Sequence, residues 1–192
     1  MTTHAGFADP VLDAQRAFRA VLDAMAHPGR VVTLAPAEAP APLGVATAAV
    51  CLTLLDLDTP VWLDAAAATA DVVAWLRFHS GAPVVGAPAA ARFAVIVDAA
   101  AMPALEAFEP GTDERPDLSA TVVVQVPALA AGRGVRLTGP GIETAARLEV
   151  GGAPALWPGL RANAARFPRG VDVILCAGAR LAALPRTTRV EA

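Results

Sequence analysis

The chain has 192 residues, a formal net charge of -3 and 55% hydrophobic residues, so it is long enough and apolar enough to bury a substantial core in one domain. All fifteen basic residues are arginine. Schiff-base catalysis, pyridoxal phosphate chemistry and a phosphate loop ending in Gly-Lys-Ser/Thr each need a lysine and are therefore excluded. No block of like charge occurs, and the sequence indicates no nucleic-acid partner.

The sequence also predicts a cytoplasmic protein that makes no membrane contact. Its first residues show no basic region followed by an apolar run, so no signal peptide is expected. The longest uncharged run, Ala39–Leu55, is too short and too interrupted by proline and glycine to span a bilayer. Cys51 and Cys176 lie far apart and outside any metal-ligand spacing, which predicts two buried free thiols.

The first predicted element is an amphipathic helix that begins at Pro10, with Asp9 as its N-cap, and ends before His27-Pro28-Gly29. Charged residues, among them Asp13 and Arg16, are expected on its exposed face. Apolar residues at helical spacing are expected on its buried face: Phe7, Val11, Ala14, Phe18, Val21, Leu22 and Met25.

Short strands and one buried helix are expected next, in the order strand, helix, strand, strand, strand. These elements are Val31–Leu34, Val45–Leu55, Pro60–Leu63, Val84–Val85 and Arg92–Val97. The last of them is a nearly continuous apolar run, typical of a strand covered on both faces.

A further helix is predicted between the second and third of these strands, with Thr69 as its N-cap and Gly81 as its stop signal. It places Arg77 and His79 in the last turn, where the helix dipole favours cations and a side chain can reach an anion or a partner. Trp75 is a candidate interface anchor on the same helix. The alternative is that Arg77 and His79 only cap the final carbonyls of the helix.

The second half of the chain continues the alternation. One short helix is expected at Ala101–Phe108 and a surface loop at Glu109–Asp117. Strands Ala120–Val126 and Gly134–Thr138 are expected to pair as an antiparallel hairpin. Then come a helix at Ala155–Phe167 and strands at Val171–Cys176 and Leu181–Leu184.

Two short segments of this half could contact an anion. Gly139-Pro140-Gly141-Ile142 could present backbone N–H groups at a helix start, although a Pro-Gly turn is the ordinary interpretation. Arg186, Thr187 and Thr188 could bind phosphate oxygens, the alternative being a solvated C-terminal tail.

The alternation of strands and helices predicts a single α/β domain over residues 1–192, a three-layer sandwich with a mixed, mainly parallel sheet. No nucleophile–base pair and no metal-ligand motif of known spacing occurs, so no catalytic residue, metal or cofactor is predicted. If the chain turned over nucleotide alone, Asp56, Asp58 or Asp172 would have to stabilise positive charge. Asp172 is expected instead to form a structural ion pair with Arg169.

Several short motifs, spread over nearly the whole chain, together resemble the PhnH family of the bacterial carbon–phosphorus lyase system. They are Pro10-Val11, Ala14-Gln15-Arg16, Phe18-Arg19, Ala24-Met25-Ala26-His27-Pro28-Gly29, Leu54-Leu55-Asp56, Trp62-Leu63, Trp75-Leu76-Arg77-Phe78-His79-Ser80-Gly81-Ala82-Pro83, Leu118-Ser119-Ala120-Thr121, Gly139-Pro140-Gly141-Ile142, Asn163, Phe167-Pro168-Arg169-Gly170-Val171-Asp172 and Pro185-Arg186-Thr187-Thr188.

The resemblance implies a cytoplasmic subunit, expected as a homodimer, that works with other core subunits of carbon–phosphorus lyase. In that family the complex joins an alkylphosphonate to the ribose of ATP, releases adenine and forms ribose 1-alkylphosphonate 5-triphosphate. The implied fold is similar to that of pyridoxal-phosphate-dependent transferases but without the cofactor. Arg77, His79, Trp75, Arg186, Thr187 and Thr188 would then face partner subunits or complete a nucleotide or phosphonate site at an interface. A dimeric scaffold with no ligand contact is the alternative.

Overall fold

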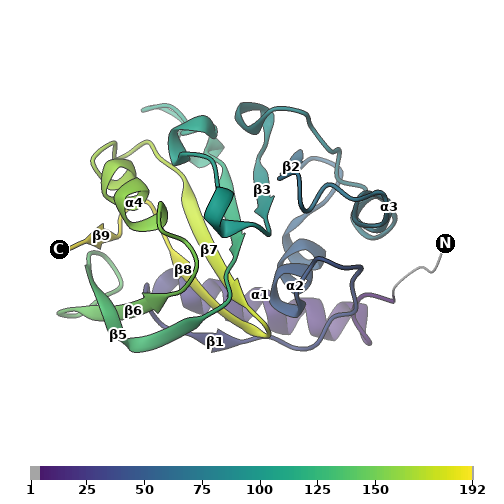
Figure 1. The fold of residues 1–192 in the computed structure, drawn as a ribbon, viewed down its shortest axis with the longest axis horizontal. Coiled ribbons are helices and arrows are strands. Elements are labelled where there is room, and N and C mark those ends of the chain that lie inside the picture. Colours follow the sequence, from purple (N-terminus) through teal and green to yellow (C-terminus); the bar gives the residue numbers. More distant parts are fainter. Residues whose placement is uncertain (1–4, 192) are drawn as a thin grey trace.

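The computed structural model describes residues 5–191, and its centre is a six-stranded sheet in the order β1-β8-β7-β4-β3-β2 (Figure 1). Its strands are β1 (Val32–Thr33), β2 (Val61–Leu63), β3 (Phe93–Ile96), β4 (Thr121–Gln125), β7 (Asp172–Ala177) and β8 (Arg180–Leu184). Neighbours from β2 to β7 pair in parallel, whereas β8 and β1 are antiparallel. The predicted mixed, mainly parallel sheet is confirmed.

Both faces of this sheet are covered, because successive side chains of a strand point to opposite faces. In β4, Val123 contacts the core on one side, and Val122 and Val124 contact the core on the other. The first core includes side chains of α1 (Pro10–Ala26), α2 (Val45–Leu54) and α3 (Ala70–His79). The second includes α4 (Leu156–Ala164) and the short 3-10 helices after β3 (Figure 1). The three predicted layers are thus present.

A second, three-stranded sheet of order β6-β5-β9 lies outside the main one. It contains β5 (Leu129–Thr138), β6 (Ala146–Val150) and β9 (Arg189–Val190). The predicted hairpin between the 120–126 and 134–138 strands is wrong, because β4 pairs in parallel with β3 and β7, and β5 pairs with β6 and β9. The physical reason is burial: β4 is apolar on both faces and needs a central position, whereas much of β5 is exposed.

Helix α1 has the predicted start but a different buried face. The Asp9 carboxylate accepts hydrogen bonds from the Val11 and Leu12 N–H groups at 3.1 and 3.0 Å. Asp13, expected to be exposed, is buried, and its carboxylate accepts from the Asp9 N–H and from Arg16. The small residues Ala17 and Ala24 form most of the contact face with Val21. Val11, Phe18 and Leu22, which were expected in the core, are instead exposed.

A proline explains why one predicted helix is absent from the structure. The helix expected at Ala101–Phe108 is two 3-10 turns, Ala99–Ala101 and Leu105–Ala107, because Pro103 lies between them and cannot continue a helix. Two further 3-10 turns are Pro88–Ala90 and Pro116–Leu118. Val84, expected in a strand, makes a single bridge to Val61.

The Gly139-Pro140-Gly141-Ile142 segment is a turn, in which the Ile142 N–H donates to the Gly139 carbonyl at 3.1 Å. The Pro-Gly turn, which was the ordinary interpretation, is therefore confirmed. The segment leads to strand β6 rather than to a helix, so the alternative of an anion loop at a helix start is wrong. In the described residues no helix combines the length and the apolar character needed to cross a membrane.

Candidate functional site

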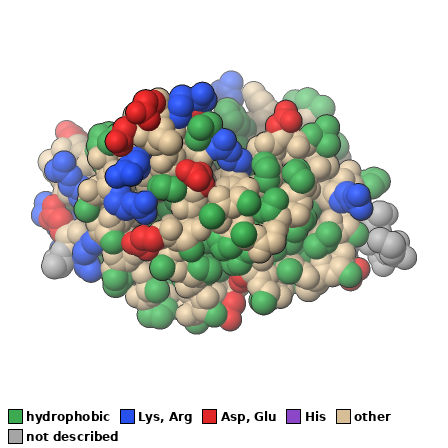
Figure 2. All heavy atoms as spheres, turned by 90° about the horizontal axis from the view of Figure 1, so that it is seen from above, with side chains coloured by type: hydrophobic (Ala, Val, Ile, Leu, Met, Phe, Trp, Pro, Cys, Tyr) green, Lys and Arg blue, Asp and Glu red, His purple; other side chains and the backbone are tan. Residues whose placement is uncertain are grey.

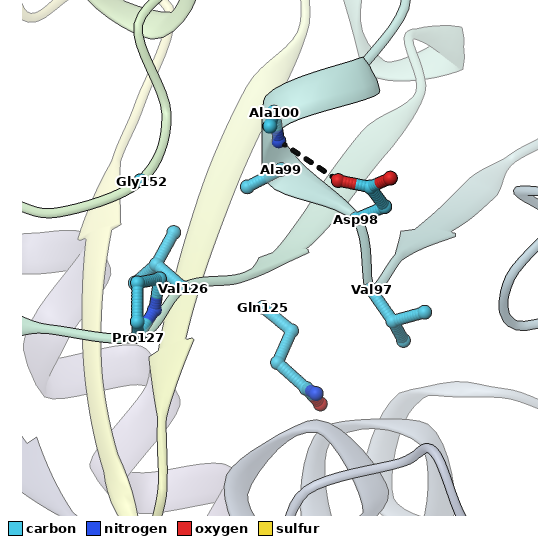
Figure 3. A pocket seen from close by; sticks show the side chains of 8 residues that line it. All are labelled: Val97, Asp98, Ala99, Ala100, Gln125, Val126, Pro127 and Gly152. Atoms are coloured by element: carbon cyan, nitrogen blue, oxygen red, sulfur yellow. Dashed lines mark hydrogen bonds between the residues drawn. The ribbon is translucent and has the colours of Figure 1, made fainter.

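A cavity of about 370 Å³ lies where β3 and β4 end (Figure 3). It is lined by residues 97–100, which follow β3, by residues 125–127 at the end of β4, and by Gly152. Ligands of open α/β sheets bind beyond the carboxyl ends of the strands, so this cavity is the first place to look for a small-molecule site.

The end of β2 contributes a buried carboxylate, but its oxygens are already used. Asp64 Oδ1 accepts from the Ala67 N–H at 2.7 Å. Its Oδ2 accepts from the Val97 and Asp98 N–H groups at 3.0 and 2.9 Å. Asp64 therefore ties the end of β2 to the end of β3 and serves the fold.

Gln125, the last residue of β4, makes a comparable link to helix α2. Its Oε1 accepts from the N–H of Gly44, the N-cap of α2, at 2.7 Å and from the Thr47 hydroxyl at 3.0 Å. Its Nε2 donates to the Pro42 carbonyl at 3.1 Å. Figure 3 shows the amide pointing toward the helix rather than across the cavity.

Asp98 is the only ionisable residue that the described part of the chain contributes to the cavity wall, and it caps the 3-10 turn that follows it. Its Oδ1 accepts from the Ala100 N–H at 3.2 Å (Figure 3). Among residues 5–191, no arginine or histidine lines the cavity. Because phosphate and phosphonate are recognised by cations or clustered N–H donors, this wall is poorly suited to an anionic substrate.

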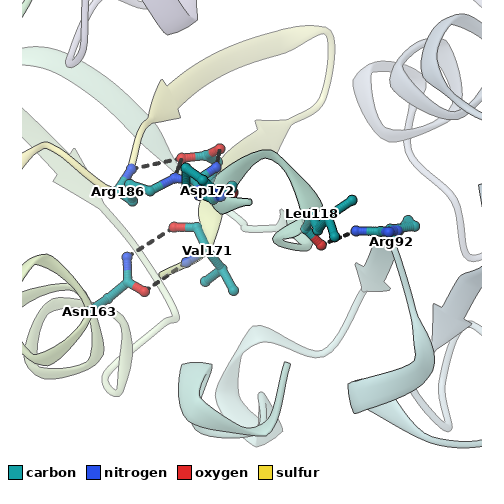
Figure 4. Close-up of polar contacts among 7 residues, drawn as sticks. Arg92, Leu118, Asn163, Val171, Asp172 and Arg186 are labelled. Carbon is teal, nitrogen blue, oxygen red and sulfur yellow. Dashed lines mark hydrogen bonds and ion pairs between the residues drawn. The ribbon is translucent and has the colours of Figure 1, made fainter. Parts of the chain in front are cut away.

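At the opposite edge, where β7 begins, Arg186 and Asp172 form a two-pronged ion pair (Figure 4). Arg186 Nε and Nη2 donate to the two Asp172 oxygens at 3.2 and 2.7 Å, and the Arg186 backbone N–H donates to Oδ1 at 2.8 Å. Nη1 donates to the Pro116 carbonyl. The expected pairing of Asp172 with Arg169 is wrong, since Arg169 pairs with Asp113 at 3.3 Å.

Neighbouring contacts fasten the same edge (Figure 4). The Asn163 amide exchanges two 2.9 Å hydrogen bonds with the backbone of Val171, and Arg92 donates to the Leu118 carbonyl. Viewed from this side, Figure 2 shows hydrophobic side chains over the middle of the surface and charged ones gathered toward α4 and β9. A cleft of about 260 Å³ is lined by prolines, Phe167, Arg186 and Thr187.

The C-terminal segment is part of the fold. Thr188 is 2% exposed, and its hydroxyl has no hydrogen-bond partner among the described residues. Arg189 and Val190 then form β9, which pairs with β5. The solvated-tail interpretation of this segment is therefore wrong, and the Arg186 guanidinium is neutralised inside the chain.

At the end of α3, unlike at the start of β7, the arginine is not part of an ion pair among the described residues. Thr69 caps the helix start as predicted, its hydroxyl accepting from the Val72 N–H at 3.2 Å. Trp75 is 4% exposed and its ring lies 5.0 Å from that of His79, which also meets the Phe78 ring at 4.9 Å. Arg77 is exposed and has no hydrogen bond or ion pair within residues 5–191. Ser80, rather than Arg77, caps the Leu76 carbonyl through both its N–H and its hydroxyl.

The two predicted groups of site residues lie apart. Helix α3 packs beside β2 at one side of the molecule, and the segment that leads to β9 lies at the other side (Figure 1). Arg77 and His79 therefore form no common site with Arg186, Thr187 and Thr188 within one copy of the chain.

Both thiols are buried as predicted. Burial raises the pKa of Cys51 and that of Cys176 to about 12, so both stay protonated at neutral pH. No cluster of three or more His, Cys, Asp or Glu side chains in the described part of the chain could hold a metal ion.

A family model described as "Bacterial phosphonate metabolism protein (PhnH)" matches residues 5–191. The chain belongs to the PhnH family. Among curated relatives, a Rhizobium meliloti (strain 1021) protein named alpha-D-ribose 1-methylphosphonate 5-triphosphate synthase subunit PhnH is 45% identical over 187 residues, covering 96% of this chain and 94% of its own. A Stutzerimonas stutzeri protein named putative C-P lyase subunit protein HtxG is 37% identical, covering 92% and 85%.

This PhnH-family chain thus has polar residues at its strand ends that are engaged in its own fold. Sequence reasoning missed Asp64 and Gln125, and it quoted Asn163 without a role. A polar residue that directly follows a buried strand was the available signal for the first two. The exposed apolar face of α1 was missed because its residues were assigned to the core.

Proposed function

We propose that this chain is a subunit of an alpha-D-ribose 1-methylphosphonate 5-triphosphate synthase in the carbon–phosphorus lyase system. It is needed there to join an alkylphosphonate to the ribose of ATP with release of adenine. The observation that supports this most is the 45% identity to the Rhizobium meliloti subunit over nearly the full length of both chains.

The described chemistry supports a subunit rather than a self-sufficient enzyme. Displacement at ribose C1 needs a group to stabilise positive charge and cations to position a triphosphate. Asp172 is neutralised by Arg186, and the described residues place no cation in the wall of the cavity at the strand ends. The chain alone is therefore expected to release no adenine, and other core subunits of the complex would supply the missing groups.

We assign the predicted residues to contacts within this assembly. Arg77, on the same helix as the packed rings of Trp75 and His79, would face a partner subunit, because its side chain is exposed and has no ion pair within residues 5–191. Arg186 and Thr187, which line the cleft beside Phe167, would act by shaping it, because the Arg186 charge is already balanced. The buried Thr188 would hold this segment in place. The protein would be cytoplasmic, homodimeric and similar in fold to pyridoxal-phosphate-dependent transferases without the cofactor. The absence of lysine agrees with the last point.

A non-catalytic dimeric scaffold with no ligand contact is the second candidate. The specific observation in its favour is that the described residues lining the cavity at the strand ends include no arginine and no histidine. The two candidates differ in whether a nucleotide or phosphonate binds the isolated chain, since binding to the native state must raise its thermal stability.

The decisive experiment is co-expression of the partner subunits with and without this chain, followed by measurement of adenine release from ATP plus methylphosphonate. Assembly is confirmed by size. We expect release only when the chain is present and none from the chain alone. Unchanged release without the chain would contradict the proposal. Thermal protection of the isolated chain by ATP or methylphosphonate would contradict the scaffold alternative.

A further inference from the structure

A further cavity, of about 330 Å³, lies at the edge of the main sheet where β3 and β4 begin. It is lined by residues 89–92, Glu109 and Leu118, and it is thus at the opposite end of these strands from the cavity beside Gln125. Its wall contains both a cation and a carboxylate, and three alanines and Leu118 supply an apolar remainder. A largely apolar wall with a few charged groups is typical of a small-molecule site.

Both charged residues of this wall are held by the backbone at the start of β4. The Arg92 carbonyl accepts from the Thr121 N–H at 2.9 Å, and the Glu109 carbonyl accepts from the Ala120 N–H at 2.8 Å. Ala120 and Thr121 are neighbours, so a single strand start fixes the backbone of both charged residues. Groups attached to the ends of sheet strands are positioned more precisely than groups on free loops.

Arg92 keeps most of its hydrogen-bonding capacity for a ligand. Its Nη1 donates to the Leu118 carbonyl, which fixes the guanidinium beside another residue of the same wall (Figure 4). Its Nε and Nη2 donate to no acceptor within residues 5–191. Hydrogen bonds from Arg115, at 3.0 and 2.8 Å, lower the pKa of Asp117, and the Arg92 charge adds to this effect. Because Asp117 is already paired with Arg115, the Arg92 fork can bind the oxygens of an anion.

Glu109 likewise has an oxygen to spare. Its Oε1 accepts from the Gly111 N–H at 3.0 Å, and its Oε2 accepts no hydrogen bond in the described part of the chain. Within residues 5–191 no ion pair joins Glu109 to Arg92, although both line one cavity. Both residues are half-buried, so dissolved salt screens their charges less than it screens fully exposed ones. The wall therefore presents two separate, opposite charges.

We propose that this cavity binds a small zwitterion, with its anionic group on Arg92 and its ammonium group on Glu109. Arg92 attracts a simple anion and Glu109 repels it, and a simple cation meets the reverse, so only a ligand with both charges gains from both residues. Aminoalkylphosphonates and amino acids share this chemistry. Leu118 and the three alanines would contact the methylene groups between the two charges. The inference goes beyond the proposed function, because it concerns a site of the chain itself and needs no partner subunit.

The first test measures binding to the full chain by isothermal titration calorimetry. We expect 2-aminoethylphosphonate to bind about tenfold or more tightly than ethylphosphonate, which lacks only the amino group, and more tightly than ethylamine, which lacks the anion. β-Alanine, with a carboxylate in place of the phosphonate, distinguishes the two sources: the tighter of the two zwitterions identifies the class. Equal binding of 2-aminoethylphosphonate and ethylphosphonate, or no binding of either zwitterion, overturns the inference.

The second test removes one charge at a time. Glu109→Gln keeps an oxygen for the Gly111 N–H, so it should weaken 2-aminoethylphosphonate about tenfold or more and leave ethylphosphonate unchanged or tighter. Arg92→Gln should weaken both ligands. Arg147→Gln is the matched control, because Arg147 also donates to a backbone carbonyl, that of Gly134 at 3.0 Å, but lies on β6 away from this cavity. Circular dichroism shows whether each variant is folded. If Arg92→Gln does not fold, Glu109→Gln decides alone, and an equal loss of both ligands in that variant overturns the inference.

Discussion

Two arginine-containing segments, both predicted from the sequence to contact an anion or a partner, have opposite states in the structure. Arg186 is about 15% exposed and gives its guanidinium to Asp172 and to a backbone carbonyl. Arg77 is exposed and bonds to nothing in the described part of the chain. The first arginine is engaged in the fold, whereas the second makes no such contact among the described residues.

The difference shows that the role of an arginine depends on its neighbours in the folded structure and not on its neighbours in the sequence. Arg186 follows β8, the hairpin partner of β7, and β7 begins with Asp172, so the sheet itself brings the two charges together. Arg77 lies in the last turn of α3, on the side of the edge strand β2. The carboxylate that follows β2, Asp64, accepts hydrogen bonds from backbone N–H groups and not from Arg77.

The largest expected effect is on the Arg186 side of this comparison. Asp172→Ala leaves a largely buried guanidinium without its counter-charge, which typically lowers the free energy of unfolding by about 3–5 kcal/mol. Urea unfolding monitored by circular dichroism measures the change. Arg77→Ala is the matched control, expected to change stability by less than about 0.5 kcal/mol. Equal losses in the two variants would contradict the comparison.

Much of the fold could be predicted from the sequence, because caps and apolar runs are local signals. Asp9, Thr69 and the β-branched run of β4 each gave the correct element. The pairing of β4 could not be predicted, because both of its neighbours are distant in sequence.

The candidate site was less predictable for a related reason. Asp172 was assigned to Arg169, three residues away, although its partner is fourteen residues away across a hairpin. For α1, periodicity showed an apolar arc but could not show which part of that arc the core would cover. Small residues decided it, since Ala17 and Ala24 allow closer packing than Phe18 does.

The two buried thiols are expected to make the stability of the chain depend on pH. Burial raises the pKa of both Cys51 and Cys176 from 9.0 to about 12, so above pH 9 the unfolded chain loses protons that the native chain keeps. Their contribution to stability is complete below pH 9 and is lost as the pH rises toward 12, by about 1.4 kcal/mol per pH unit for each thiol.

This slope can be measured cleanly, because the chain contains no lysine and no tyrosine that would titrate in the same range. Urea unfolding between pH 8 and pH 11, which is from about one unit below to about two units above the usual thiol pKa, should show this decrease in stability. The double variant Cys51→Ala with Cys176→Ala should lose most of the dependence. An unchanged slope in that variant would show that the thiols are not its source.

Gln125 tests whether a polar residue in the cavity wall serves the fold. Gln125→Leu removes the acceptor of the Gly44 N–H and the Thr47 hydroxyl, and the expected loss of stability is about 1–3 kcal/mol. Thr47→Val removes one of these bonds and should cost less. If Gln125→Leu left stability unchanged but weakened binding of ATP or methylphosphonate, Gln125 would belong with the ligand-facing residues.

A change at Arg77 has the smallest expected effect on the stability of the isolated chain. An effect on assembly or activity can therefore be measured without a loss of stability beside it. Arg77→Glu should leave the urea midpoint unchanged, because the side chain is exposed and unpaired within residues 5–191. It should weaken assembly with the other subunits about tenfold or more, since reversing a charge at a contact sets like against like. Pull-down of the co-expressed subunits and adenine release measure the two consequences. Arg161→Glu, a charge reversal at another exposed arginine, on α4, is the control for net charge. If both variants assemble and release adenine normally, Arg77 is an ordinary surface residue, and the contrast with Arg186 concerns stability alone.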